Sequence, residues 1–109
     1  MKLIVAIVQD KDVGKLVMEL TKKEFRSTKL ASTGGFLGGG NTTLLIGIED
    51  EKVNQVLEII KETCHSRTQV TTPVIPVGLG SDSFLPIPTE VTIGGATLFV
   101  LEVAQFEKI

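Results

Sequence analysis

The sequence has few of the residues that usually do chemistry in proteins. Cys64 is its single cysteine and His65 is its single histidine. One cysteine excludes an internal disulfide, and a zinc site needs three or four ligands, for which the sequence offers no second cluster. No serine has a histidine and an aspartate grouped with it as a nucleophile would need. We therefore expect no metal site, no catalytic residue and no cofactor, and we expect Cys64 to be inert at a helix end.

An excess of charge of one sign is also lacking. Lysine and arginine number 11 against 13 acidic residues, a net charge of -2. This excludes the broad basic surface that binds nucleic acid polymers or acidic membranes, so a few placed groups would have to hold an anionic ligand. The apolar run Leu3–Val8 is too short for a signal peptide or a membrane span. We interpret it as a buried strand and expect a cytoplasmic protein.

The length of 109 residues predicts one domain, residues 1–109. A domain of this size buries only about two-thirds of the surface of its unfolded chain. Oligomerisation would therefore be a natural way to bury more.

The two halves of the chain repeat one pattern with an offset of forty residues. Residues 3–8 and 43–48 are apolar and predict strands. Each is followed by apolar residues spaced i, i+3, i+4 and i+7, which predicts an amphipathic helix. The matched helix positions are Val13 with Val53, Leu16 with Val56, Val17 with Leu57, and Leu20 with Ile60. A further strand-like stretch then begins at Thr28 in one half and at Thr68 in the other.

Both predicted helices have plausible capping residues. Asp10 or Asp12 can cap the first and Asp50 the second, which places negative charge near the positive end of each helix dipole. The first helix should end near Glu24-Phe25 and the second near Cys64-His65.

A β-α-β unit used twice predicts an α+β fold, the ferredoxin-like β-α-β-β-α-β sandwich, with two helices on one face of an antiparallel sheet. Residues 2–8 and 42–48 are apolar on both faces of their predicted strands, which indicates that both sheet faces are buried. No third helix is predicted. We therefore expect another subunit to cover the second face.

Two connections are distinctive. Residues 33–41 hold five glycines around Phe36 and Leu37, and residues 73–88 contain all four prolines. A connection as long as residues 73–88 is usually functional or mobile. The glycine-rich loop lacks the Lys-Ser or Lys-Thr of a Walker A motif and opens no helix, which excludes the nucleotide fingerprint of a Rossmann fold. It is either a flexible hairpin tip or a place where a nucleobase or a neighbouring subunit covers the two apolar side chains.

Three further residues are candidates for binding a ligand. The chain has nine lysines but only two arginines, Arg26 and Arg67, each after a predicted helix. Both could interact with the helix dipole, or Arg26 could hold a phosphate with its planar fork. Strand alternation would place Thr28 beside Arg26. Asn41 carries the donor and acceptor that the edge of an adenine needs, although it could equally be a turn residue.

These residues carry a resemblance to a known family. Residues 25–37, FRSTKLASTGGFL, followed by residues 40–43, GNTT, resemble the signature of PII-like cyclic di-AMP receptors. Residues 4–10 and 94–100 resemble it too, so the likeness runs nearly end to end. The chain departs from the family pattern at Gly38-Gly39, at Phe84 and in its last four residues.

The resemblance implies a PII-like signal transduction protein, a homotrimer with a short glycine-rich loop and an enlarged later loop. It also implies that cyclic di-AMP binds in the clefts between subunits and that an unknown downstream protein reads the loops. The implied ligand-binding residues are Arg26, Thr28, Gly35, Phe36, Leu37, Asn41 and Gly47. Gly47 is an isolated glycine within a strand, which can mark close approach of a ligand.

Other functions stay open at this point. The chain could be a classical PII-like regulator that binds ATP or ADP in the same cleft, or a structural trimer whose loops bind only protein. A small nucleotide-hydrolysing enzyme is a third alternative, against which the missing base and metal cluster argue. We expect a binding protein and not an enzyme.

Overall fold

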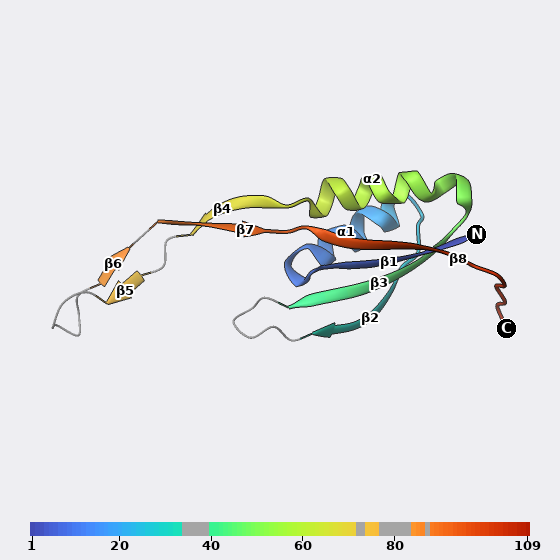
Figure 1. Ribbon diagram of the computed structural model, residues 1–109, viewed down its shortest axis with the longest axis horizontal. Helices are drawn as coiled ribbons and strands as arrows, with labels where there is room; N and C mark the ends of the chain where they lie inside the picture. Colours follow the sequence, from blue (N-terminus) through green and yellow to red (C-terminus); the bar gives the residue numbers. More distant parts are fainter. Residues whose placement is uncertain (34–39, 72–73, 77–83, 87) are drawn as a thin grey trace.

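The computed structural model describes residues 1–33, 40–71, 74–76, 84–86 and 88–109. Figure 1 shows its elements in chain order. They are β1 (Lys2–Gln9), α1 (Asp10–Lys22), β2 (Thr28–Thr33), β3 (Asn41–Ile48), the short 3-10 helix η2 (Asp50–Lys52), α2 (Val53–Cys64), β4 (Arg67–Thr71), β5 (Val74–Pro76), β6 (Phe84–Pro86), β7 (Thr89–Ile93) and β8 (Ala96–Glu102). The strands and helices that the repeat predicts up to Cys64 are confirmed.

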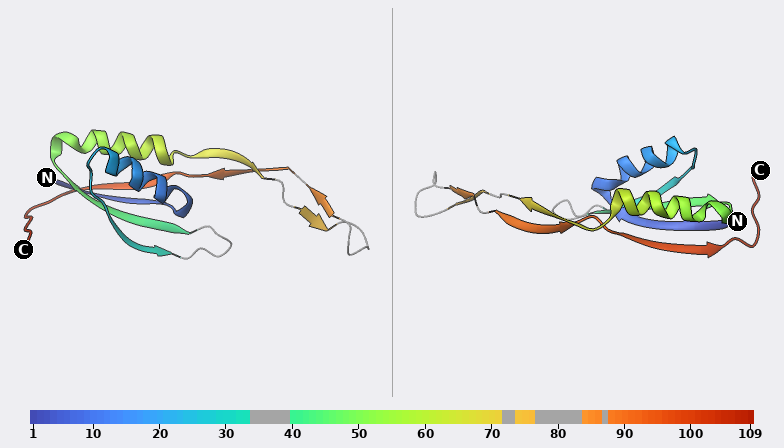
Figure 2. Two further views of the ribbon diagram at one scale, coloured as in Figure 1. Left: turned by 180° about the vertical axis from the view of Figure 1, so that it is seen from behind. Right: turned by 90° about the horizontal axis from the view of Figure 1, so that it is seen from above.

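The main sheet has the strand order β2-β3-β1-β8. All its neighbouring strands are antiparallel, and β1 pairs with β3 on one side and β8 on the other. The helices α1 and α2 lie together on one face of this sheet (Figure 2). This mixed α/β arrangement is compatible with the predicted ferredoxin-like fold.

The strand that completes the main sheet differs from the one that the repeat predicts. The stretch that begins near Thr68 forms β4, which pairs with β7 in a separate two-stranded sheet. The fourth place in the main sheet goes to β8 instead. The sequence of β4 is RTQVT, with one large apolar residue, whereas β8 reads ATLFVLE. Only β8 has enough apolar side chains to extend a packed sheet, and this decides the pairing.

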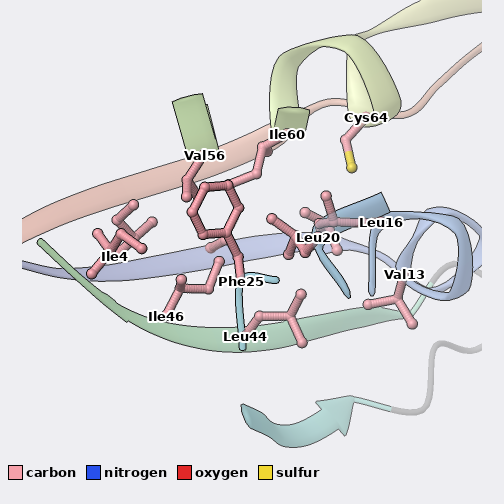
Figure 3. Packing of buried hydrophobic residues seen from close by; sticks show 13 residues of the cluster. Ile4, Val13, Leu16, Leu20, Phe25, Leu44, Ile46, Val56, Ile60 and Cys64 are labelled. Carbon is pink, nitrogen blue, oxygen red and sulfur yellow. The ribbon is translucent and has the colours of Figure 1, made fainter. Parts of the chain in front are cut away.

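The core lies between the helices and the covered sheet face (Figure 3). The predicted helix stripes supply it, with Leu16, Leu20, Val56 and Ile60 fully buried. The remaining buried apolar residues are Ile4, Ala6, Val8, Val13, Phe25, Leu44, Ile46, Ile48 and Cys64. Each large aliphatic side chain buried here contributes about 1.5–3 kcal/mol relative to an exposed one.

The other face of the sheet is apolar as well. In β1, the residues between the core residues point to this face. They lie opposite apolar residues of β3 and β8, as Val5 lies opposite Leu45 and Phe99. We call this surface the open face; its apolar members are Leu3, Val5, Ile7, Leu45, Phe99 and Leu101. Phe99 is 51% exposed and Leu101 48% exposed. No described element of the chain covers the open face.

The strands β4 and β7 form an arm that extends away from the helices (Figure 1). Along this direction the molecule measures 66 Å, against 24 and 21 Å across. A two-stranded ribbon alone is marginally stable in water, so the arm depends on how its root is held. Arg67, the first residue of β4, pairs with Ile93 at the end of β7, and together they mark that root.

An ion pair fixes the root of the arm to α1. The side chain of Asp12 is 6% exposed and accepts a hydrogen bond from Nη2 of Arg67 at 2.7 Å. Arg67 also donates from Nη1 to the backbone carbonyl of His65 at 3.1 Å. Gly94 has φ of +80°, and a Cβ there would meet Nη1 of Arg67 and would lie 2.5 Å from the backbone carbonyl oxygen of His65, which has no freedom to move aside, so only glycine fits beside this pair.

The predicted capping by aspartates is wrong. Neither helix has a side-chain hydrogen bond at its N-cap. Asp10 instead accepts a hydrogen bond from Oγ1 of Thr42 at 2.5 Å, and Asp50 pairs with the amino group of Met1 at 2.9 Å. Tertiary partners compete successfully for these carboxylates. Their negative charge still lies near the positive end of the helix dipole.

We predict that Arg67→Met lowers the free energy of unfolding by about 2 kcal/mol, because it leaves the buried carboxylate of Asp12 without its partner, while the partial exposure of Arg67 weakens the pair. Urea unfolding at fixed protein concentration measures the change. Arg26→Met is the matched control, since Arg26 is exposed and makes no ion pair with any residue that the structure describes. Equal midpoints for the two variants would contradict the assigned role of the ion pair.

Candidate functional site

The seven predicted binding residues fall into three groups. Gly35, Phe36 and Leu37 lie outside the described residues. Arg26, Thr28 and Gly47 lie at one end of the neighbouring strands β2 and β3, and Asn41 lies at the other end. The structure therefore brings some of the predicted residues together and separates others.

A tight helix end positions Arg26. The backbone N–H of Phe25 bonds the carbonyl of Leu20 at 2.9 Å, and that of Glu24 bonds Thr21 at 2.9 Å, while Glu24 has φ of +63°. This is a Schellman motif, in which a left-handed residue ends the helix. Phe25 follows and is 6% exposed, packed in the core. Its burial anchors the chain so that Arg26 leaves the core at the start of the edge strand.

Arg26 and Thr28 line one hollow between the end of α1 and the start of β2. Its volume is about 640 Å³. The other lining residues are Val17, Thr21, Glu24, Phe25 and Ser27. Thr28 pairs with Leu45 on β3, so Gly47 lies two residues further along the same neighbouring strand. A Cβ on Gly47 would meet no atom within 4 Å, so packing within this chain does not require a glycine there. We call Arg26, Thr28 and Gly47 the edge half-site.

The two arginines have different roles. The guanidinium of Arg67 is engaged by Asp12 and by the His65 carbonyl. Arg26 is exposed and makes no ion pair within the described ranges. The backbone groups after α1 already bond one another, so the helix end does not depend on Arg26. Of the two, Arg26 is the arginine that can bind an external anion.

Asn41 lines a second hollow, at the opposite end of β3. Its volume is about 360 Å³. The residues that line it with Asn41 are Ile7, Gln9, Gly94, Gly95, Ala96 and Thr97. Asn41 pairs with Gln9 on β1 and with Thr33 on β2. Because residues 34–39 join β2 to β3, the glycine-rich loop leaves the sheet at this end. We call Asn41 and this hollow the loop half-site.

The two half-sites are far apart within one chain. The strand β2 runs from Thr28 in the edge half-site to Thr33, the partner of Asn41. The β3 partners of these two residues, Leu45 and Asn41, are four strand steps apart, which at about 3.3 Å each span about 13 Å. The edge half-site offers a cation and a hydroxyl for phosphate, and the loop half-site offers an amide for a base edge. A single adenine or phosphate cannot touch both.

Sequence reasoning missed Gln9 and Thr97 as parts of the site. Gln9 is the last residue of β1 and Thr97 lies on β8, and they meet Asn41 only because β1 lies between β3 and β8. The sequence feature that could have indicated Gln9 is that it is a polar residue at the end of an apolar strand. That feature does not predict that β8 pairs with β1.

The third hollow, of about 420 Å³, lies between α2 and β8. Cys64 lines it and is fully buried at the last residue of α2. Burial is the main cause that raises the pKa of the Cys64 thiol to about 11, and the nearby Asp12 adds to this effect. Among the described residues, no group of three or more His, Cys, Asp and Glu side chains could hold a metal ion. None of the helices described is long and apolar enough to cross a membrane.

Comparisons with known proteins extend over the whole chain. Residues 1–109 match the family model described as "Cyclic-di-AMP receptor". The chain is also similar to a solved structure, the crystal structure of a functionally unknown protein from Pediococcus pentosaceus ATCC 25745. The two share 47% sequence identity over 99% of this chain and 96% of that chain, with a TM-score of 0.79. This likeness shows that the two chains share a fold. It suggests no ligand, because the relative is described as functionally unknown.

We predict that Cys64 reacts with iodoacetamide at least tenfold more slowly in the folded protein than in urea at pH 9. The thiolate is the reactive form, and a folded-state pKa of about 11 leaves little of it at that pH. Mass spectrometry of the alkylated chain measures both rates. Comparable rates would mean that the thiol is accessible and ionised, and would contradict an inert role.

Proposed function

This chain belongs to the cyclic di-AMP receptor family, and from that premise we propose that it is a PII-like signal transduction protein that binds cyclic di-AMP in clefts between the subunits of a homotrimer. The observation that carries the proposal is the separation of the two half-sites within one chain. Each half-site suits a different part of a ligand that has two phosphates and two adenines. The role is binding and signalling, as expected of a receptor.

The edge half-site suits the phosphates. The exposed guanidinium of Arg26 can form a bidentate, charge-assisted pair with phosphate oxygens, which lysine could not match in geometry. Thr28 lines the same hollow and adds a hydroxyl. Gly47 leaves the neighbouring strand open to a ligand, because no side chain stands there.

The loop half-site suits an adenine. A carboxamide such as Asn41 can pair with both the donor and the acceptor on the adenine edge. Gly35, Phe36 and Leu37, which lie outside the described residues, would cover the face of the base from the adjoining loop. Stacking of this kind is worth about 1–3 kcal/mol per base.

A homotrimer would join the two half-sites and also cover the open face. A ligand held by Arg26 of one chain and Asn41 of the next would bridge a subunit cleft. The open face would lie inside the assembly, where burying Val5, Phe99 and Leu101 is favourable at roughly 25 cal/mol per Å² of apolar surface. One arrangement thus removes the exposed apolar band and completes the site.

Signalling would follow from the arm. Its two strands, β4 and β7, return to the body at Gly94 and Gly95, which line the loop half-site. A ligand bound there would favour one position of the arm over others. An unknown downstream protein would read that position, as partners do with segments that order on binding.

We predict a molar mass near three times 11.7 kDa by light scattering. Val5→Glu, on the open face, should shift the mass towards that of a single chain, because it buries an unpaired charge in the assembly. Met18→Glu is the matched control, since Met18 is an apolar residue 54% exposed on the helix layer. A wild-type monomer, or loss of assembly with Met18→Glu alone, would contradict the trimer built on the open face.

We predict saturable binding of about one cyclic di-AMP per chain by isothermal titration, in preference to cyclic di-GMP and ATP. Arg26→Ala and Asn41→Ala should each weaken binding at least tenfold. The first removes hydrogen bonds to a charged phosphate, worth roughly 1.5–3 kcal/mol, and the second removes two neutral hydrogen bonds to the base, worth roughly 0.5–1.5 kcal/mol each. Both variants should keep the mass of the wild-type assembly.

Lys15→Ala is the control for these variants, since it removes one exposed positive charge from the helix layer. It should bind as the wild type does. Wild-type affinity in both Arg26→Ala and Asn41→Ala would refute the site, and tighter binding of ATP than of cyclic di-AMP would make the chain a classical PII-like regulator.

A further inference from the structure

The side chain of Gln9 is held in one orientation at the loop half-site. Gln9 pairs with Asn41 across the sheet, and both line the same hollow. The carboxamide oxygen of Gln9 accepts a hydrogen bond from the backbone N–H of Gly94 at 2.8 Å. The backbone N–H can only donate, so this contact assigns the oxygen and the nitrogen of the amide.

This assignment decides what Gln9 can offer a ligand. Since its oxygen is engaged by Gly94, the group it presents is the amide nitrogen, with two N–H donors. Val8, the preceding residue, is buried under the helices, so strand alternation places Gln9 on the opposite side, on the same face as Ile7 and Asn41. That is the side on which the proposed subunit cleft would form.

The hollow beside Gln9 has the chemistry of a nucleobase pocket. Its volume of about 360 Å³ lies within the usual size of small-ligand sites, about 300–1,000 Å³. Ile7 supplies an apolar wall, and Thr97 and Asn41 supply polar groups. Gly94 and Gly95 have φ of +80° and +93°, which favours glycine, and their lack of side chains leaves the hollow accessible.

We propose that Gln9 is a ligand-contacting residue of the cyclic di-AMP site, and that its amide nitrogen donates a hydrogen bond to a ring nitrogen of the adenine held by Asn41. This inference rests on the proposed function and adds a residue to it. The adenine ring carries acceptor nitrogens besides the pair of groups that one carboxamide can read, so two adjacent carboxamides have separate partners on one base.

The same side chain connects the ligand to the root of the arm. Its oxygen holds Gly94, and Gly94 packs against Arg67, the first residue of β4, whose guanidinium is fixed by Asp12. A base that engages the nitrogen of Gln9 therefore stabilises the orientation that holds the returning end of the arm. Ligand and arm are linked through a single amide.

Two substitutions distinguish the role of the Gln9 amide nitrogen from that of its oxygen. Gln9→Glu keeps oxygens that can accept from Gly94 but removes the donor and puts a negative charge beside a ligand with two phosphates. Gln9→Met has a similar length and removes both groups. Titration with cyclic di-AMP measures affinity, and hydrogen exchange of the Gly94 amide, followed by NMR, measures whether the root of the arm is still held.

We expect Gln9→Glu to bind cyclic di-AMP at least tenfold more weakly than the wild type, with unchanged exchange of the Gly94 amide and unchanged molar mass. We expect Gln9→Met to lose affinity and also to exchange Gly94 faster. Repeating the titrations at about 0.1 and 1 M salt separates a lost hydrogen bond, which persists, from long-range repulsion, which is screened.

Affinity of Gln9→Glu within twofold of the wild type would overturn the inference. A loss of affinity that disappears at high salt would also overturn it, since Gln9→Glu would then act by long-range repulsion. A loss that comes with a changed molar mass or with faster exchange of the Gly94 amide would overturn it too, since the substitution would then act through the structure.

Asn41→Ala in the same series distinguishes failure of the proposed function from failure of the role of Gln9. If the wild type binds cyclic di-AMP and Asn41→Ala lowers the affinity while Gln9→Glu does not, only the role of Gln9 is contradicted. If the wild type does not bind cyclic di-AMP, the proposed function is contradicted, and the role of Gln9 with it.

Discussion

The burial of one sheet face by α1 and α2 is the constraint on which the rest of this structure depends. β1 is apolar on both of its sides, and the helices cover only the side with Ile4, Ala6 and Val8. The residues between them, such as Val5, join Leu45 and Phe99 in a continuous apolar band. A sheet built this way is stable in water only when something else covers the band. In the proposed homotrimer, a second and a third copy of the chain would cover this band.

The position of the candidate site follows from the same constraint. The strands β2, at the edge of the sheet, and β3, its neighbour, carry the two half-sites at opposite ends, Arg26 near one and Asn41 at the other. The fold engages its other arginine, Arg67, in holding the arm to Asp12, and leaves Arg26 exposed. In the proposed function, Arg67 therefore has a structural role and Arg26 a binding role, and a neighbouring subunit would turn the separate halves into a complete site.

Much of the architecture could be predicted from local patterns. Apolar residues at helical spacing predicted which sides of α1 and α2 are buried, and the apolar strands β1 and β3 were predicted from their composition. These patterns report burial, which is a property of each segment. The completing strand was predicted wrongly, because the repeat matched Thr68 to Thr28 although pairing depends on the apolar content of β8, far along the chain.

The side-chain contacts were harder to predict for a related reason. Asp10 and Asp50 have the right residue type and position for helix caps, but Thr42 and the amino group of Met1 compete for them across the fold. Gln9 became part of the site only when the structure placed Gly94 and Asn41 on either side of it. Strand alternation predicted that Thr28 lies beside Arg26, and the two line one hollow. The pairing of β2 with β3 brings Gly47 to the same sheet end, which spacing in the sequence did not predict.

The most direct test of the account is complementation between two defective subunits. Arg26→Ala and Asn41→Ala chains, unfolded together and refolded as mixed trimers, would form some clefts that combine the intact edge half-site of one chain with the intact loop half-site of the other. Random assembly of a cyclic trimer gives such clefts about a quarter of the time. The account predicts that the mixture regains tight cyclic di-AMP binding at about that fraction of wild-type capacity, whereas each variant alone does not. No recovery in mixed trimers of confirmed composition would mean that each chain supplies both halves of its own site, and would contradict a site shared between subunits.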